Sequence, residues 1–140
     1  MSHLSFEISV NQENYEISAK VTVIGQDLLI VITGGDHPHI GDVTTLTRND
    51  EPQTVRFPSH DGRFHKDDFV SNRIAKAIQA NLPGSCTITA GIHVDGITKA
   101  QIAAAGSMAD QLGNQLNDWL KTQSFGQNTP KYYDKNEAPK

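Results

Sequence analysis

Five of the six histidines lie in loops or at a strand end, each close to aspartate, glycine or proline, and none is at a core position of the apolar pattern: His37, His39, His60, His65 and His93. Imidazole and carboxylate groups together suit divalent metals such as Zn, Mn, Fe, Ni or Cu. If the strands that end near residues 33 and 93 meet in space, four of these side chains share one pocket: His37, His39, His93 and Asp95. Candidate metal ligands are His37, His39 and His93, although His-Pro-His is a weak signal and the chain has no helical His-x-x-x-His pair.

A second loop places positive charge at the expected start of a helix, in the stretch His65-Lys66-Asp67-Asp68. The aspartates fit there without a ligand, because a carboxylate caps free N–H groups and complements the helix dipole. His65 and Lys66 do not fit unless an anion is bound. A phosphate held by Lys66, the helix end and a glycine-rich backbone would explain them, with Arg56 and Arg63 as further contacts.

The sequence has no convincing set of nucleophile and base. Cys86 alternates in phase with apolar residues and is expected to be a buried thiol. Ser59, His60 and Asp61 are contiguous, whereas the members of a catalytic triad converge from separate segments. A small metal-dependent hydrolase or isomerase remains an alternative, with the four-residue pocket as metal site and Asp36 or Asp67 as general base.

Strand patterns dominate the first half of the chain. Alternating apolar residues predict a hairpin over 4–10 and 15–23, and the apolar run 28–33 predicts a buried strand that ends at Gly34-Gly35. Residues 42–48 predict a further strand, and 54–57 predict a short edge strand that ends at Pro58.

The second half alternates helix, strand and helix. Apolar residues at helical spacing follow Asp67 and Asp68, Pro83-Gly84 ends that helix, and residues 86–94 predict a strand. Thr98 and Gln101 match a capping box that opens a second helix. We therefore expect an α+β domain over residues 1–123, an antiparallel sheet of about six strands covered by two helices. Residues 124–140 are polar and are expected to form a flexible tail.

Composition narrows the functional class. A net charge of −4 and a pI near 5.8 argue against general nucleic-acid binding, because no basic excess faces the phosphates. No apolar run approaches the ~20 residues that span a bilayer. The first residues show no basic segment followed by an apolar one, so no signal peptide is indicated and a cytoplasmic protein is expected.

Three segments, residues 32–41, 65–68 and 90–99, together resemble the prenylated flavin chaperone family (LpdD-like), over roughly residues 5–120. The resemblance implies a non-enzymatic protein with a proteasome-assembly-chaperone-like fold, often dimeric, so a homodimer is expected. It also implies binding of prenylated FMN, or of FMN, and its storage or delivery to UbiD-type decarboxylases of phenolic acids such as gallate.

Carried over by position, the resemblance assigns these cofactor-binding residues: Gly34, Gly35, His37, Pro38, His39, Ile40, Gly41, His65, Lys66, Asp67, His93 and Asp95. Lys66 and the glycine backbone would take the phosphate, and the imidazoles would hydrogen-bond the ring edge or hold a divalent metal that bridges to it. Phe64, Ile40 and Ile92 are candidate apolar walls for the ring. Gly96 departs from the asparagine of many relatives. An assembly factor that acts only through a sheet edge or its helices is a third hypothesis.

Overall fold

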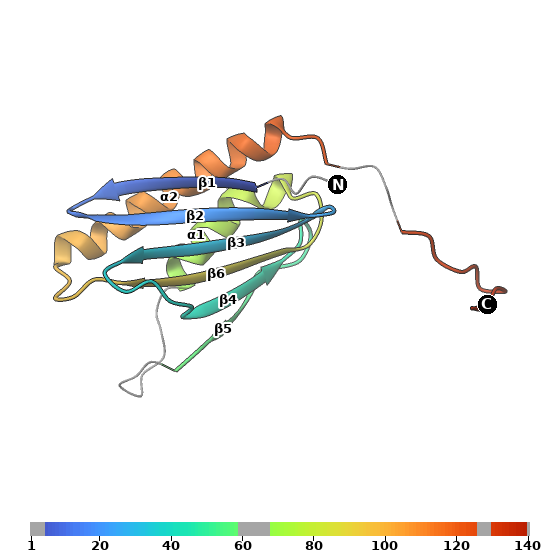
Figure 1. Cartoon of the computed structure of the whole chain (residues 1–140), viewed down its shortest axis with the longest axis horizontal. Coiled ribbons are helices and arrows are strands. Elements are labelled where there is room, and N and C mark those ends of the chain that lie inside the picture. The colour runs from blue at the N-terminus through green and yellow to red at the C-terminus, as the bar shows by residue number, and fades with distance from the viewer. Residues whose placement is uncertain (1–4, 59–67, 126–129, 140) are drawn as a thin grey trace.

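The structure, a computed structural model, describes residues 5–58, 68–125 and 130–139. Its six strands form one sheet in the order β1-β2-β3-β6-β4-β5 (Figure 1). The first three strands run consecutively as a meander, β1 (Ser5–Gln12), β2 (Tyr15–Ile24) and β3 (Asp27–Gly35). The other three are β4 (Asp42–Leu46), β5 (Gln53–Arg56) and β6 (Cys86–His93). The short strand β5 lies at an edge of the sheet, as the sequence predicts.

The sheet is mixed, so the prediction of a purely antiparallel sheet is wrong. β6 inserts between β3 and β4, parallel to β3 and antiparallel to β4. The chain reaches β6 through helix α1 (Asp68–Ile78) and a short 3₁₀ turn over Gln79–Asn81. A helical crossover of this kind returns the chain to its starting end, which is what a parallel pair requires. As a result, β3 and β6 end side by side at the same end of the sheet (Figure 1).

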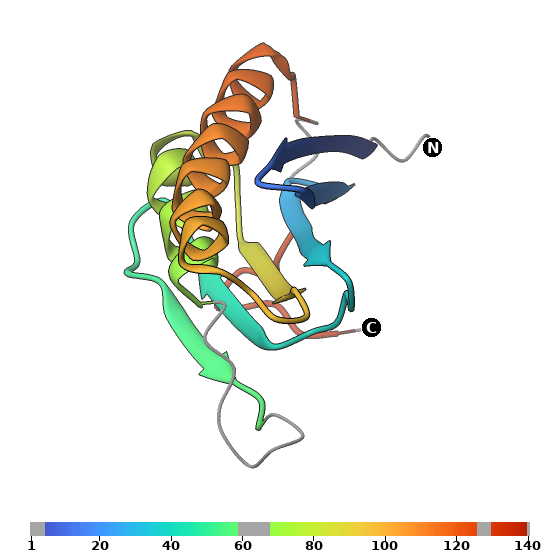
Figure 2. The ribbon, with the colours of Figure 1, turned by 90° about the vertical axis from the view of Figure 1, so that its left-hand side faces the viewer.

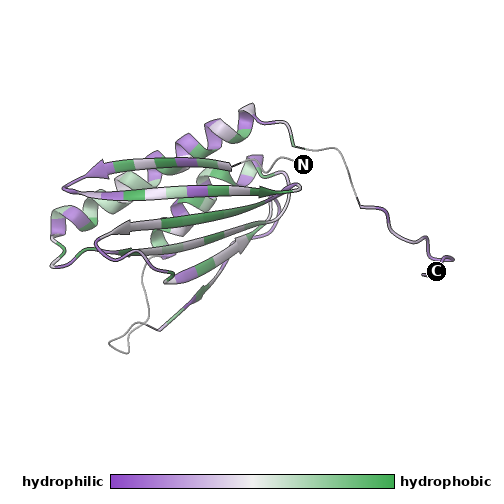
Figure 3. Cartoon of the chain, viewed as in Figure 1, coloured by the Kyte–Doolittle hydropathy of each residue, from purple (hydrophilic) through white to green (hydrophobic). Residues whose placement is uncertain are grey.

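Both helices cover the same face of the sheet (Figure 2). The long helix α2 (Lys99–Thr122) packs on α1 and on β1, and α1 also contacts β4 and β6. Every second side chain of the central strands is buried under these helices, because side chains alternate between the faces of a strand. The residues of β3 and β6 in this core are Leu28, Ile30, Ile32, Cys86, Ile88 and Ala90. The apolar segments lie along the strands, whereas the end of the chain is hydrophilic (Figure 3).

The first turns of the two helices make different contacts. Thr98 precedes α2, and its side chain accepts a hydrogen bond from the backbone of Gln101 while the Gln101 side chain accepts one from the backbone of Thr98. This is the predicted capping box. Asp68 lies in the first turn of α1 and forms an ion pair with Arg56 of β5. Arg56 is therefore engaged within the fold and is not a free cation for a phosphate.

Helix α2 ends at Thr122, beside an aromatic group formed by Phe6, Trp119 and Phe125. The rings of Phe6 and Trp119 stack with centroids 4.9 Å apart, which ties the edge strand β1 to the last turns of α2. Among the residues described, no helix is long and apolar enough to cross a membrane. The predicted division at residue 123 stays a prediction.

Candidate functional site

The parallel pairing of β3 with β6 builds the candidate site. Gly35 is aligned with His93 in this pair, so the loop after β3 lies against the loop after β6. The backbone N–H groups of Asp36 and His37 both donate to the carbonyl oxygen of His93, at 2.6 and 3.3 Å. In the opposite direction, the Asp95 N–H donates to Asp36 Oδ2 at 2.8 Å. Three hydrogen bonds thus hold the two loops together.

Two histidines share the Asp95 carboxylate. His37 Nε2 lies 3.1 Å from Asp95 Oδ2, and His93 Nε2 lies 3.0 Å from Asp95 Oδ1. The two imidazole rings are inclined to one another at 53°, with centroids 5.4 Å apart. All three side chains are open to solvent, with exposed fractions of 65% for His37, 65% for Asp95 and 54% for His93. We call these three residues the His–Asp–His cluster.

Asp95 is held in its ionised form. The hydrogen bonds from His37 and His93 lower the pKa of Asp95 below its ordinary value of 3.8. An ionised carboxylate only accepts hydrogen bonds, so both imidazoles must carry a proton on Nε2. In its neutral form each ring then has Nδ1 as a hydrogen-bond acceptor.

Glycine is required at the two strand ends for steric reasons. Gly35 has a φ of +77°, and a Cβ built there would lie 2.1 Å from the carbonyl oxygen of His93. A Cβ on Gly91 would lie 1.7 Å from the carbonyl oxygen of His39. The loop of residues 36–41 can therefore lie directly on β6 only because both positions lack a side chain.

The backbone of this loop is already hydrogen-bonded inside the fold. Besides the N–H groups of Asp36 and His37, the Gly41 N–H donates to Ala90 O at 2.7 Å, and the Gly41 carbonyl accepts from Phe57 N at 2.8 Å. His39 Nδ1 lies 2.8 Å from the carbonyl oxygen of its neighbour His37. The N–H groups of residues 36, 37 and 41 thus serve to position the loop rather than to hold a phosphate.

The structure brings together most of the expected residues that it describes. Gly34, Gly35, His37, Pro38, His39, Ile40, Gly41, His93 and Asp95 all lie at the end of β3 and β6 or in the loops that follow. Ile40 is 57% exposed, whereas Ile92 is half-buried against the core. His60, Arg63, Phe64, His65, Lys66 and Asp67 lie outside the described residues.

The metal set of His37, His39 and His93 has no support. Within residues 5–58, 68–125 and 130–139, no group of three or more His, Cys, Asp or Glu side chains is arranged to hold a metal ion. The Nε2 atoms of His37 and His93 are directed at different oxygens of one carboxylate instead of at a common centre.

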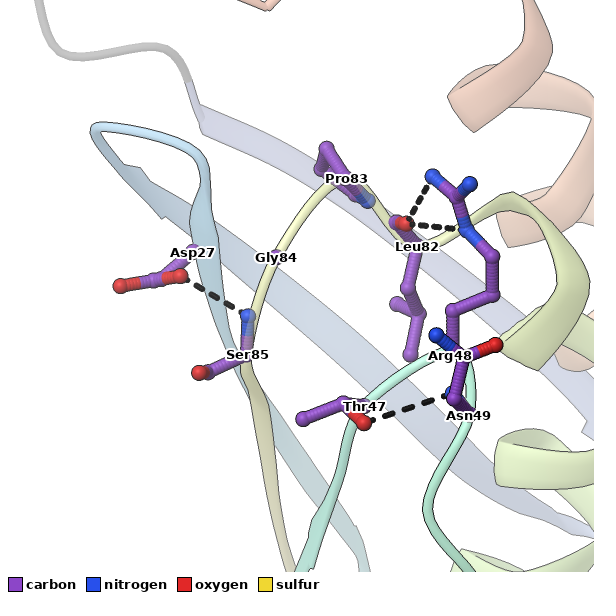
Figure 4. A pocket seen from close by; sticks show the side chains of 8 residues that line it. All are labelled: Asp27, Thr47, Arg48, Asn49, Leu82, Pro83, Gly84 and Ser85. Atoms are coloured by element: carbon purple, nitrogen blue, oxygen red, sulfur yellow. Dashed lines mark hydrogen bonds between the residues drawn. The ribbon is translucent and has the colours of Figure 1, made fainter. Parts of the chain in front are cut away.

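A shallow pocket of about 430 Å³ lies at the other end of the sheet, lined by Asp27, Thr47, Arg48, Asn49, Leu82, Pro83, Gly84 and Ser85 (Figure 4). The Arg48 guanidinium donates to the carbonyl oxygen of Leu82 through Nε at 3.2 Å and Nη2 at 2.9 Å. Asp27 Oδ1 accepts from the backbone N–H of Ser85 at 2.8 Å. The charged side chains of this pocket thus hydrogen-bond to the backbone that lines it. The side chains of the His–Asp–His cluster, in contrast, are mostly exposed to solvent.

Sequence reasoning missed two residues of the site. It gave Asp36 only the role of a general base in the enzyme alternative, although its carboxylate holds the backbone of Asp95. It also gave Gly91 no role, although the His39 carbonyl packs against it. A glycine inside a predicted strand is a sign of close backbone approach, so Gly91 was detectable in principle.

A family model and a curated relative agree on one family. The model of the prenylated flavin chaperone LpdD-like domain matches residues 11–121. A relative from Lactiplantibacillus plantarum, Protein LpdD, is 58% identical over 132 residues, which cover 94% of this chain and 97% of the relative. A crystal structure of a chaperone complex for yeast 20S proteasome assembly contains a chain with 11% identity and a TM-score of 0.49, covering 87% of this chain and 98% of that one.

Proposed function

This chain belongs to the prenylated flavin chaperone LpdD-like family, and we propose that it holds its flavin at the sheet end where the His–Asp–His cluster lies. It is a non-catalytic chaperone for prenylated flavin. The main support for this location is that hydrogen bonds join two loops far apart in sequence, so that His37, His93 and Asp95 are exposed side by side. The metal-dependent hydrolase or isomerase gains no support.

The exposed groups fit the chemistry of prenylated FMN, which has a phosphate, a ribityl chain with hydroxyl groups and a large planar ring. With Nε2 of each imidazole directed at Asp95, Nδ1 of His37 and His93 is the atom that accepts a hydrogen bond from ring N–H or ribityl O–H groups. Two exposed apolar side chains, Ile40 at 57% and Ile97 at 43%, follow β3 and β6 and provide contacts for the ring. An open site suits a protein that must also release its ligand.

We place the phosphate end of the flavin at His65 and Lys66, which lie outside the described residues. The glycine-rich loop is a poorer candidate, because its N–H groups at Asp36, His37 and Gly41 are already bonded to carbonyls of β6. Lys66 provides the charge that a phosphate needs, and α1 begins two residues after it, at Asp68.

Storage of the flavin and its delivery to a UbiD-type decarboxylase of phenolic acids such as gallate complete the proposal. The protein would act in the cytoplasm as a homodimer, with residues 1–123 as the binding domain and residues 124–140 as a tail that flavin binding does not need. Truncation after residue 123 should therefore leave flavin affinity unchanged. Co-purification with such a decarboxylase, and faster activation of its apo form by the flavin-loaded protein, test the delivery step.

Anaerobic titration with reduced prenylated FMN, followed by absorbance and calorimetry, tests the binding site. FMN serves as the ligand control, and parallel titrations with and without divalent metal test whether a metal takes part. We expect His37→Ala and Lys66→Ala each to weaken binding about tenfold or more, since each removes a charged or hydrogen-bonding contact. Arg48→Ala is the matched control at the opposite end of the sheet. Binding that is lost in Arg48→Ala and kept in His37→Ala would move the site to the pocket of Figure 4.

A further inference from the structure

We infer that Asp36 is the positioning residue of the His–Asp–His cluster: it holds the Asp95 backbone so that one carboxylate accepts hydrogen bonds from both imidazoles. The role of the cluster in flavin binding rests on the proposed function. The positioning itself concerns the chain alone and is testable without any ligand.

Asp36 is joined to the end of β6 through both its main chain and its side chain. Its N–H donates to the His93 carbonyl at 2.6 Å, and its Oδ2 accepts from the Asp95 N–H at 2.8 Å. Gly35 immediately before it has a φ of +77°, which turns the chain so that residue 36 lies over β6. Asp36 therefore links the two loops through two hydrogen bonds, one from its main chain and one to its side chain.

The Asp95 side chain needs such an anchor. It is 65% exposed, and Gly96 after it has a φ of +59° with nothing within 4 Å of a built Cβ. An exposed carboxylate on a turn has several accessible rotamers, and packing does not choose among them. The hydrogen bond from its own N–H to Asp36 fixes the position of the Asp95 main chain. From that position its two oxygens lie 3.1 Å from His37 Nε2 and 3.0 Å from His93 Nε2.

The consequence is a defined proton position on both rings. With Asp95 in place, His37 and His93 keep their protons on Nε2, and Nδ1 remains the acceptor for a ligand. Without the anchor, the carboxylate moves and each neutral ring distributes its proton between Nδ1 and Nε2. The site would then present a mixture of donors and acceptors to the ligand.

Substitution of Asp36 separates a hydrogen-bonding role from a charge effect. Asp36→Asn removes the charge but keeps a side-chain oxygen that accepts the Asp95 N–H, so it should behave like the wild type. Asp36→Ala removes the acceptor and should release Asp95. Asp118→Ala, an exposed carboxylate on α2, controls for the loss of one negative charge.

Long-range ¹H–¹⁵N correlation spectra of the histidine rings, recorded on the ligand-free protein slightly above neutral pH, are the test. We expect the Nε2–H tautomer for His37 and His93 in the wild type, in Asp36→Asn and in Asp118→Ala, and a tautomer mixture in Asp36→Ala. Thermal unfolding of each variant checks that the fold is retained. An unchanged Nε2–H tautomer in Asp36→Ala, or equal loss in Asp36→Asn, would overturn the inference.

Flavin titration of the same variants then tests the link to function. Asp36→Ala should bind reduced prenylated FMN about tenfold more weakly, and Asp36→Asn should restore the affinity to within about threefold of the wild type. If His37→Ala binds as well as the wild type, the proposed flavin site fails while the tautomer result for Asp36 still stands.

Discussion

Substitution of Gly91 by alanine tests whether the loop of residues 36–41 truly rests on β6. A Cβ at this position would lie 1.7 Å from the His39 carbonyl oxygen and 2.2 Å from its carbonyl carbon. Contacts of a real Cβ essentially never fall under 3.0 Å, so the two backbones must separate by at least 3.0 − 1.7 = 1.3 Å. The neighbouring hydrogen bond from Gly41 N–H to Ala90 O, 2.7 Å long, cannot survive that movement.

The expected loss of stability follows from these two effects. Overpacking that shifts backbone costs about 1–3 kcal/mol. The lost hydrogen bond adds about 1 kcal/mol. We therefore expect Gly91→Ala to lower the free energy of unfolding by about 2–4 kcal/mol. Urea denaturation measures this loss, with the same m value fitted to the wild type and the variant. The His–Asp–His cluster should also lose flavin affinity, because its loop is displaced.

Two other glycines provide matched controls for the same chemical change. Gly25 and Gly96 have φ values of +64° and +59°, and nothing lies within 4 Å of a Cβ built on either. In Gly25→Ala and Gly96→Ala, the left-handed backbone conformation costs about 1–2 kcal/mol. The lower conformational entropy of the unfolded chain offsets about 0.4–1 kcal/mol of that cost. Gly91→Ala should therefore cost clearly more than either. A Gly91→Ala variant as stable as Gly25→Ala would refute the close approach of His39 to β6.

Three further predictions concern the cluster and the two ends of α2. Hydrogen bonds lower the pKa of Asp95 below 3.8, so its ionised form adds stability that is present above pH 3.8 and is lost as the pH falls through the lowered value. In acid titrations, the difference in the free energy of unfolding between the wild type and Asp95→Asn should therefore shrink only below pH 3.8. Thr98→Ala removes the N-cap of α2 and should cost about 1 kcal/mol, with recovery in Thr98→Ser, as measured by thermal unfolding. Trp119→Ala removes a half-buried ring stacked on Phe6 and should lower the free energy of unfolding, measured by urea denaturation, by about 2 kcal/mol. Unchanged stability of this variant would contradict the prediction.

Local patterns in the sequence predict most of the elements. Alternation identifies β1 and β2, the apolar run identifies β3, and Thr98 with Gln101 identifies the start of α2. The direction of β6 was not predictable in the same way, because pairing partners depend on contacts far apart in sequence. An apolar strand reads the same whether its neighbours run parallel or antiparallel to it.

The candidate site was predictable in part, from the types and positions of its residues. His37, His93 and Asp95 are polar residues at strand ends, where function is often found. The role of Asp36 depends on a hydrogen bond to a backbone group 59 positions away, which no local pattern encodes. The hydrogen bonds of the glycine-rich loop to carbonyls of β6 were likewise not predictable, because glycine residues also occur in loops that bind a phosphate.

The most direct test of the proposed flavin site is an anaerobic ¹H–¹⁵N chemical-shift titration of the protein with reduced prenylated FMN. We expect the largest changes to fall on residues 35–41 and 91–98, at the end of β3 and β6. Changes concentrated on residues 47–49 and 82–85, around the pocket at the opposite end of the sheet, would contradict it.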